Sequence, residues 1–181
     1  MWKREMSISI FPVGNAVDLS TFDKLDPLFL KWLDTAIKGR LEGISSSIPS
    51  FKLWHLNGSE NRITPNQTLY TFYELDSPTD IEKTLAQLQD NVVFSSSFAA
   101  SHFEFDNISF SPLGLDPDIK KTGKSYLQGK THFGLMGKFE KRKHTSKIIK
   151  LWAKKYGNNY KYQLTCCITN PFYKKEQMEQ E

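Results

Sequence analysis

Short stretches of the chain alternate between apolar and polar residues, a pattern that predicts β-strands. Residues 6–11 alternate in this way, and residues 68–75 are rich in β-branched and aromatic side chains. Further strands are predicted at 51–53, 92–98 and 101–110. The first two thirds of the chain therefore contain several short strands.

Two stretches carry apolar residues at helical spacing. The first helix is predicted to begin after Asp26, with Pro27 in its first position, and to stop at Gly43. The second is predicted to open at Ser77, with Pro78 following the capping serine. Their apolar stripes are Leu30, Leu33, Ile37 and Leu41 in the first and Ile81, Leu85 and Leu88 in the second.

The resulting order is β-α-β-β-α-β, which predicts an α+β fold of the ferredoxin-like kind over residues 1–111. That arrangement has an antiparallel sheet with two helices on one face. A basic linker or loop is expected at 112–130, a basic strand-helix-strand region at 131–170, and a disordered tail at 171–181. The helix of the second region is predicted at 139–156.

Charge divides the chain more sharply than hydrophobicity does. Residues 1–119 hold nine basic and sixteen acidic side chains, whereas residues 120–175 hold fifteen basic side chains and a single acid, Glu140. Such an asymmetry favours a polyanionic partner for the later segment.

Several classes of function are disfavoured by the composition. The chain has no run of 18 apolar residues and begins without the apolar segment of a signal peptide, so we expect a cytoplasmic protein that does not bind a membrane. Its histidines, cysteines and carboxylates lack metal-ligand spacing, and no cofactor is predicted. Residues 120–125 end like a phosphate-binding P-loop, but Asp118 stands where that motif needs glycine.

The predicted basic helix has two unlike sides. At 100° per residue a row of lysines falls on one side, and Ile148, Ile149, Trp152 and Tyr156 fall on the other. A phosphate backbone would relieve the repulsion within the row. Residues 129–138, which include a predicted glycine-rich strand, interleave glycines and cations with Phe133. This ring, like that of Tyr126, is a candidate for stacking on a base. The candidate nucleic-acid-binding residues are Lys124, Lys130, Phe133, Lys138, Arg142, Lys143, Lys147, Lys150 and Lys154.

His144 is the candidate catalytic residue. It lies among lysines and Arg142, and neighbouring cations favour the neutral imidazole. A neutral imidazole is able to act as a base on a ribose 2′-hydroxyl while lysines stabilise the extra phosphate charge. The sequence thus leaves metal-independent RNA cleavage open.

The layout resembles that of the CRISPR repeat-processing endoribonucleases, in their compact form with one ferredoxin-like domain and a basic helical region. The resemblance rests on the Ser-Ile-Ser-Ile-Phe segment at 7–11, on residues 69–75 running into the Ser77 helix, and on the basic helix at 139–156. It implies an RNA-processing role. Compact members place a catalytic histidine in the first helix, and residues 27–42 contain none, so no catalytic residue is carried over.

These observations predict a protein that binds RNA, including structured hairpin RNA, through its basic helix. Subunits of a ribonucleoprotein complex are further expected partners. The alternative is a module without enzymatic activity that docks its basic patch on an acidic protein. Both alternatives depend on lysines that gather on one outward surface.

Overall fold

The computed structural model describes residues 1–14, 17–20, 22, 24–115, 123, 127 and 129–169. It divides into two compact units, Met1–Asp116 and Pro117–Glu181. Most of the predicted linker and all of the predicted tail lie outside the described residues. In the described part of the chain, no helix is long and apolar enough to cross a bilayer.

The first helix, α1, spans Pro27–Lys38 and begins as its sequence predicts. The carboxylate of Asp26 accepts a hydrogen bond from the amide of Leu28 at 2.8 Å, a cap that contributes about 1 kcal/mol to helix stability. A 3₁₀ turn over Gly39–Leu41 follows α1, and Gly43 then takes a left-handed conformation with φ +83°.

The predicted strand at 6–11 is wrong. This segment is irregular and runs along α1, where the amide of Ile10 donates to the carbonyl of Ala36 at 2.8 Å. The indole of Trp32 also donates to the carbonyl of Met6, at 3.3 Å. Ile8 and Ile10 are half-buried, so their alternation reflects packing without a strand partner.

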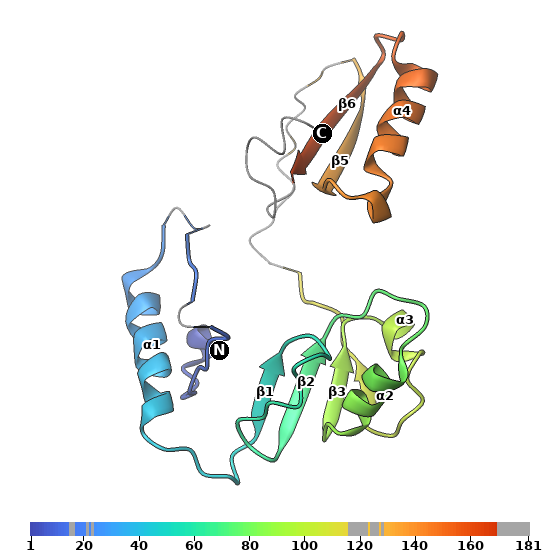
Figure 1. Cartoon of the computed structure of the whole chain (residues 1–181). Helices are drawn as coiled ribbons and strands as arrows, with labels where there is room; N and C mark the ends of the chain where they lie inside the picture. Colours follow the sequence, from blue (N-terminus) through green and yellow to red (C-terminus); the bar gives the residue numbers. More distant parts are fainter. Residues whose placement is uncertain are drawn as a thin grey trace. The chain divides into compact units, whose positions relative to one another are not determined.

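The first unit contains a four-stranded sheet in which all neighbouring strands run parallel (Figure 1). Its strands lie side by side in chain order, and helices α2, Asp80–Gln87, and α3, Ser97–Ala100, connect the last three. The strands are β1, Ser50–Leu53; β2, Gln67–Thr71; β3, Asn91–Phe94; and β4, Ile108–Phe110.

A mixed α/β fold is therefore confirmed, but the ferredoxin-like arrangement is not. That arrangement needs antiparallel pairs, and every strand pair that the structure describes is parallel. The predicted strand at 92–98 ends at Phe94, because the hydroxyl of Ser96 accepts the amide of Ala99 at 3.1 Å and caps α3. A strand's alternation does not specify the direction of its neighbour, so the pattern alone left this choice open.

The core of the first unit lies between one face of the sheet and helices α2 and α3. Leu69, Val92 and Phe94 are fully buried on this face and belong to one cluster with Ala86 of α2 and Ala99 of α3. The ring of Phe94 stacks on that of Phe103, with 4.7 Å between their centroids. Aromatic packing on small helical residues thus holds the unit together.

Polar groups hold the connection between β1 and β2. The buried amide of Gln67 donates to the carbonyl of Ser59 at 3.1 Å and to the side chain of Gln89 at 3.0 Å. Arg62 pairs with Asp90 at 3.0 Å across the same region. These contacts satisfy the side-chain nitrogen of Gln67, although not its side-chain oxygen, and fix the long connection before β2.

The second unit is a β-α-β element, as the sequence predicts for this region. Strands β5, Thr131–Lys138, and β6, Tyr162–Thr169, pair in parallel along their whole length. Helix α4, Thr145–Tyr156, connects them and follows a 3₁₀ turn over Lys141–Lys143. The helix therefore begins six residues later than the predicted start at 139.

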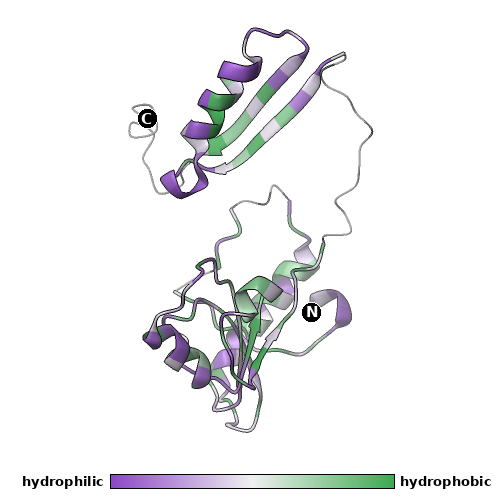
Figure 2. Ribbon diagram, turned by 90° about the vertical axis from the view of Figure 1, so that its right-hand side faces the viewer, coloured by the Kyte–Doolittle hydropathy of each residue, from purple (hydrophilic) through white to green (hydrophobic). Residues whose placement is uncertain are grey.

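Helix α4 packs on β5 and β6 through aromatic rings. The ring of Phe133 on β5 stacks on Tyr156 at 5.5 Å and meets Trp152 at 6.2 Å. Tyr162 on β6 approaches Tyr156 at 4.6 Å. Figure 2 shows hydrophobic positions on the strands and strongly hydrophilic stretches on the helix, which agrees with a one-sided contact.

Candidate anion-binding site

Cationic residues gather where β5 ends and α4 begins, a segment that we name the β5–α4 turn (residues 138–147). It contains Lys138, Lys141, Arg142, Lys143 and Lys147 against one carboxylate. Because the turn follows the carboxyl end of β5 and leads into the amino end of α4, strand and helix together position these side chains. The turn thus carries a concentrated positive charge.

Two residues with positive φ shape the turn. Gly137 has φ +139°, a conformation that side chains other than glycine rarely adopt. A Cβ placed there would lie 3.6 Å from Nζ of Lys143, so this lysine folds back over the glycine backbone. His144 has φ 52° and ends the 3₁₀ turn just before α4. The sharp reversals bring the later cations back beside the end of β5.

Glu140 holds two of these cations. Its Oε1 accepts from a guanidinium nitrogen of Arg142 at 3.3 Å and lies 3.5 Å from Nζ of Lys143. The carboxylate is half-buried, whereas both cations are exposed. Exposed pairs of this kind contribute little to stability, so their main effect is to position the two cations.

The amino end of α4 adds a further positive field. His144 occupies the N-cap position without a side-chain capping hydrogen bond, and the first turn contains no acidic residue. Uncapped first-turn amides and the helix dipole both favour an anion at this end. The arrangement is thus suited to binding a phosphate or another compact anion.

The structure separates the predicted binding residues into two groups. Lys138, Lys143 and His144 lie at the carboxyl end of β5, whereas Lys130 precedes β5 and Lys154 lies in the last turn of α4. The 12 residues of α4 extend over ~18 Å. The predicted set is therefore too extended for one small ligand. Lys124 and Tyr126 lie outside the described residues.

The lysine row along α4 is exposed. Lys147, Lys150 and Lys154 all face solvent, and among the described residues none of the three forms an ion pair. Lys143 differs because it pairs with Glu140. The opposite side of α4 packs on the strands through Trp152 and Tyr156, although Ile148 stays 41% exposed.

Phe133 is engaged within its own unit. Its ring is half-buried among Trp152, Tyr156 and Tyr162. Stacking on a base would require this packing to open, so Phe133 is not counted among the residues that bind an anion. The sequence pattern placed Phe133 in a glycine-rich strand but did not show that α4 covers it.

Other chemistry finds little support among the described residues. They include no group of three or more histidine, cysteine, aspartate or glutamate side chains placed to hold a metal ion. Cys166 and Cys167 are both free and exposed on β6. The histidine proposed as a base, His144, is exposed in the turn. RNA cleavage by this residue stays a prediction.

Two features of the site were missed by sequence reasoning. One is Gly137, whose positive φ lets Lys143 approach the strand end. The other is Glu140, which appeared only as an isolated acid in a basic segment and proves to pair with two cations. A glycine four positions before the basic run at 141–143 was the available signal for the turn.

Comparisons with protein-family models, with curated proteins and with solved structures found no match for this chain.

Proposed function

We propose that the second unit binds a phosphorylated small molecule of the nucleotide class at the β5–α4 turn. In open sheets of parallel strands, ligands bind beyond the carboxyl ends of the strands. The turn lies at that end of β5 and continues into the uncapped start of α4. The observation that carries the proposal is the cluster of Lys138, Lys141, Arg142 and Lys143 at this one end.

The chemistry of the turn favours phosphate over a single carboxylate. A phosphate has several acceptor oxygens, and both lysine ammonium groups and helix amides donate to it. Glu140 pairs with Arg142 and Lys143, and residues 138–143 contain four cations and this one carboxylate. The net charge of this segment is therefore positive, which favours a di- or triphosphate.

RNA binding is the second candidate, and the exposed lysine row favours it. Lys147, Lys150 and Lys154 continue the positive surface along α4, as an extended phosphate backbone would require. The resemblance to CRISPR repeat-processing enzymes adds no support, because parallel pairing argues against the ferredoxin-like sheet on which it depended. Partner subunits of a ribonucleoprotein complex belong to this candidate, whereas docking of the basic patch on an acidic protein stays a separate alternative.

The ligand that binds tightly, a nucleoside diphosphate or a hairpin RNA, separates the two candidates. We expect adenosine, guanosine or uridine diphosphate to bind the wild-type chain with one-to-one stoichiometry in isothermal titration calorimetry. A hairpin RNA should bind only weakly and lose affinity steeply with salt, since each neutralised phosphate of a strand contributes a log–log slope of about −0.7 to −0.9.

The opposite result would favour RNA. Tight binding of the hairpin with a slope of about −3 or steeper, without detectable nucleotide binding, would replace the first candidate by the second. Binding of neither ligand would remove both. Inorganic phosphate serves as the control for unspecific attraction of anions, and it should bind more weakly than the diphosphates.

A further inference from the structure

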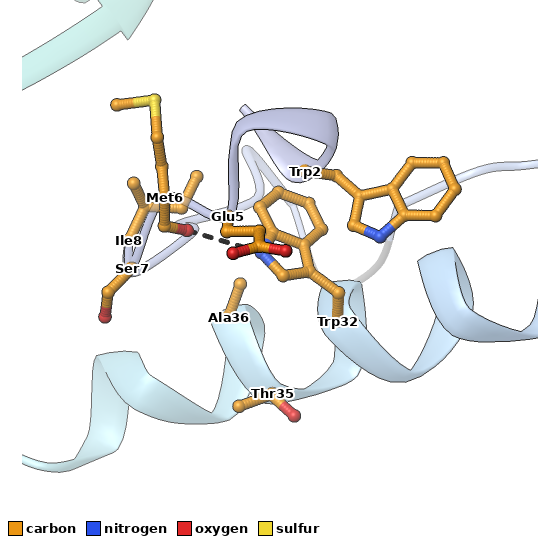
Figure 3. A pocket seen from close by; sticks show the side chains of 8 residues that line it. All are labelled: Trp2, Glu5, Met6, Ser7, Ile8, Trp32, Thr35 and Ala36. Carbon is orange, nitrogen blue, oxygen red and sulfur yellow. Dashed lines mark hydrogen bonds between the residues drawn. The ribbon is translucent and has the colours of Figure 1, made fainter.

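A second candidate site lies in the first unit and is independent of the proposed phosphate site. It is a cavity of about 350 Å³ between the N-terminal segment and α1. Such a volume is within the range of small-molecule sites. Its lining includes two indoles and a carboxylate; the main residues are Trp2, Glu5, Met6, Ile8, Trp32 and Ala36 (Figure 3).

Local backbone structure builds this cavity. A 3₁₀ turn over Trp2–Arg4 ends at Glu5, whose amide donates to the carbonyl of Trp2 at 2.8 Å. Glu5 takes a left-handed conformation with φ 53°, which turns the chain back toward α1. The indole of Trp32 then fixes the following residue through its hydrogen bond to the carbonyl of Met6.

The ring of Phe29 packs against both indoles. The ring of Phe29 lies 5.3 Å from that of Trp2 and 6.1 Å from that of Trp32, measured between centroids. In the view of Figure 3 the carboxylate of Glu5 is drawn over the indole of Trp32, with Trp2 to one side and Met6 to the other. The lining therefore combines two indole rings with one negative charge.

None of the described residues that line the cavity is cationic. Within the described part of the chain, the carboxylate of Glu5 forms no ion pair and no side-chain hydrogen bond. Carboxylate and ring quadrupoles would repel an anion, whereas both attract a cation. The lining therefore favours a ligand with a positive charge.

We propose that this cavity binds a methylated ammonium group, such as that of choline. Aromatic faces attract quaternary ammonium ions, and the methyl groups pack on apolar walls without needing hydrogen bonds. This matches a lining whose polar acceptors are few, because the carbonyl of Met6 already accepts from Trp32. Glu5 supplies the counter-charge at the open side.

Choline and its uncharged isostere, 3,3-dimethylbutan-1-ol, test the proposal directly. We expect choline to shift the indole N–H signals of Trp2 and Trp32 in ¹H–¹⁵N NMR spectra of the full chain, and to leave those of Trp54 and Trp152 in place. The isostere, which lacks the charge, should bind about tenfold more weakly. Any purification tag should be placed at the C-terminus, because Trp2 and Glu5 of the cavity lie close to the N-terminus.

A carboxylate variant supplies the second arm. Glu5→Gln should weaken choline binding severalfold and leave the isostere unaffected, while Arg4→Gln, outside the lining, should preserve both. Circular dichroism spectra of each variant exclude unfolding as the cause. Any of four results would overturn the proposal. Choline and the isostere could bind equally well, or the Glu5→Gln variant could bind choline as tightly as wild type does. Glucose could bind in place of choline, or choline could cause no saturable shift.

Discussion

Replacing Phe94 by alanine is expected to destabilise the first unit by about 3–5 kcal/mol. The side chain is fully buried, stacks on Phe103 at 4.7 Å and contacts Tyr73 at 6.5 Å, again between centroids. Removing the ring leaves a cavity that the small residues of the neighbouring helices do not fill. Urea unfolding followed by circular dichroism measures the change in the free energy of unfolding.

A nearby phenylalanine provides the matched control. Phe98 lies on α3, close in sequence to Phe94, but its side chain is 57% exposed. Phe98→Ala should therefore cost less than about 1 kcal/mol. If both variants lost the same stability, the core would not lie on the face of the sheet that carries Leu69, Val92 and Phe94.

Reversing two charges in the β5–α4 turn should have the largest effect on binding. The double variant Lys141→Glu/Lys143→Glu is expected to lower affinity for a nucleoside diphosphate by about 100-fold or more, since each charge-assisted contact contributes roughly 1.5–3 kcal/mol. Glutamates near the start of α4 are compatible with its dipole, so the fold should persist. Calorimetric titration measures the affinity.

The lysine row supplies an equally charged control. Lys150→Glu/Lys154→Glu changes the net charge by the same amount but acts farther along α4. We expect nucleotide affinity to stay within about threefold of wild type, because exposed charges beyond a Debye length are largely screened. Comparable losses in both double variants would instead indicate an extended polyanion spread along the whole helix.

The start of α1 was the most predictable feature of the fold. The Asp26 cap followed by Pro27 fixed the start of α1, because capping depends on neighbouring residues alone. The start of α2 was displaced by two residues: Thr79, not Ser77, caps the helix, and it forms a capping box with Glu82. Several residues there were able to serve as caps, and the box favoured Thr79.

Strand direction was not predictable from the same signals. Residues 51–53, 68–71 and 92–94 were recognised as strand, yet the pairing of Leu69 with Val92 is parallel. The alternation of a strand depends on its two faces, whereas parallel pairing depends on the helices that cross between strands. Helix α3 was hidden because its four residues, Ser97–Ala100, are too few to show helical periodicity.

Local sequence signals predicted the anion-binding site only in part. The sequence indicated a basic helix and a basic segment that contains Arg142 and His144, both of which depend on the local order of residues. It did not indicate that parallel strands would place Lys130 and Lys154 away from Lys143, because that separation follows from the β-α-β connection. Tertiary packing likewise placed Phe133 beneath α4.

The most direct test of the proposed function is a ¹H–¹⁵N NMR titration of the full chain with a nucleoside diphosphate. Binding at the β5–α4 turn predicts saturable shifts of the amides of Gly137, Lys143, Thr145 and Ser146, with little change at Lys130 and Lys154. Shifts spread evenly from Lys130 to Lys154, or no saturable shift at the turn, would contradict it.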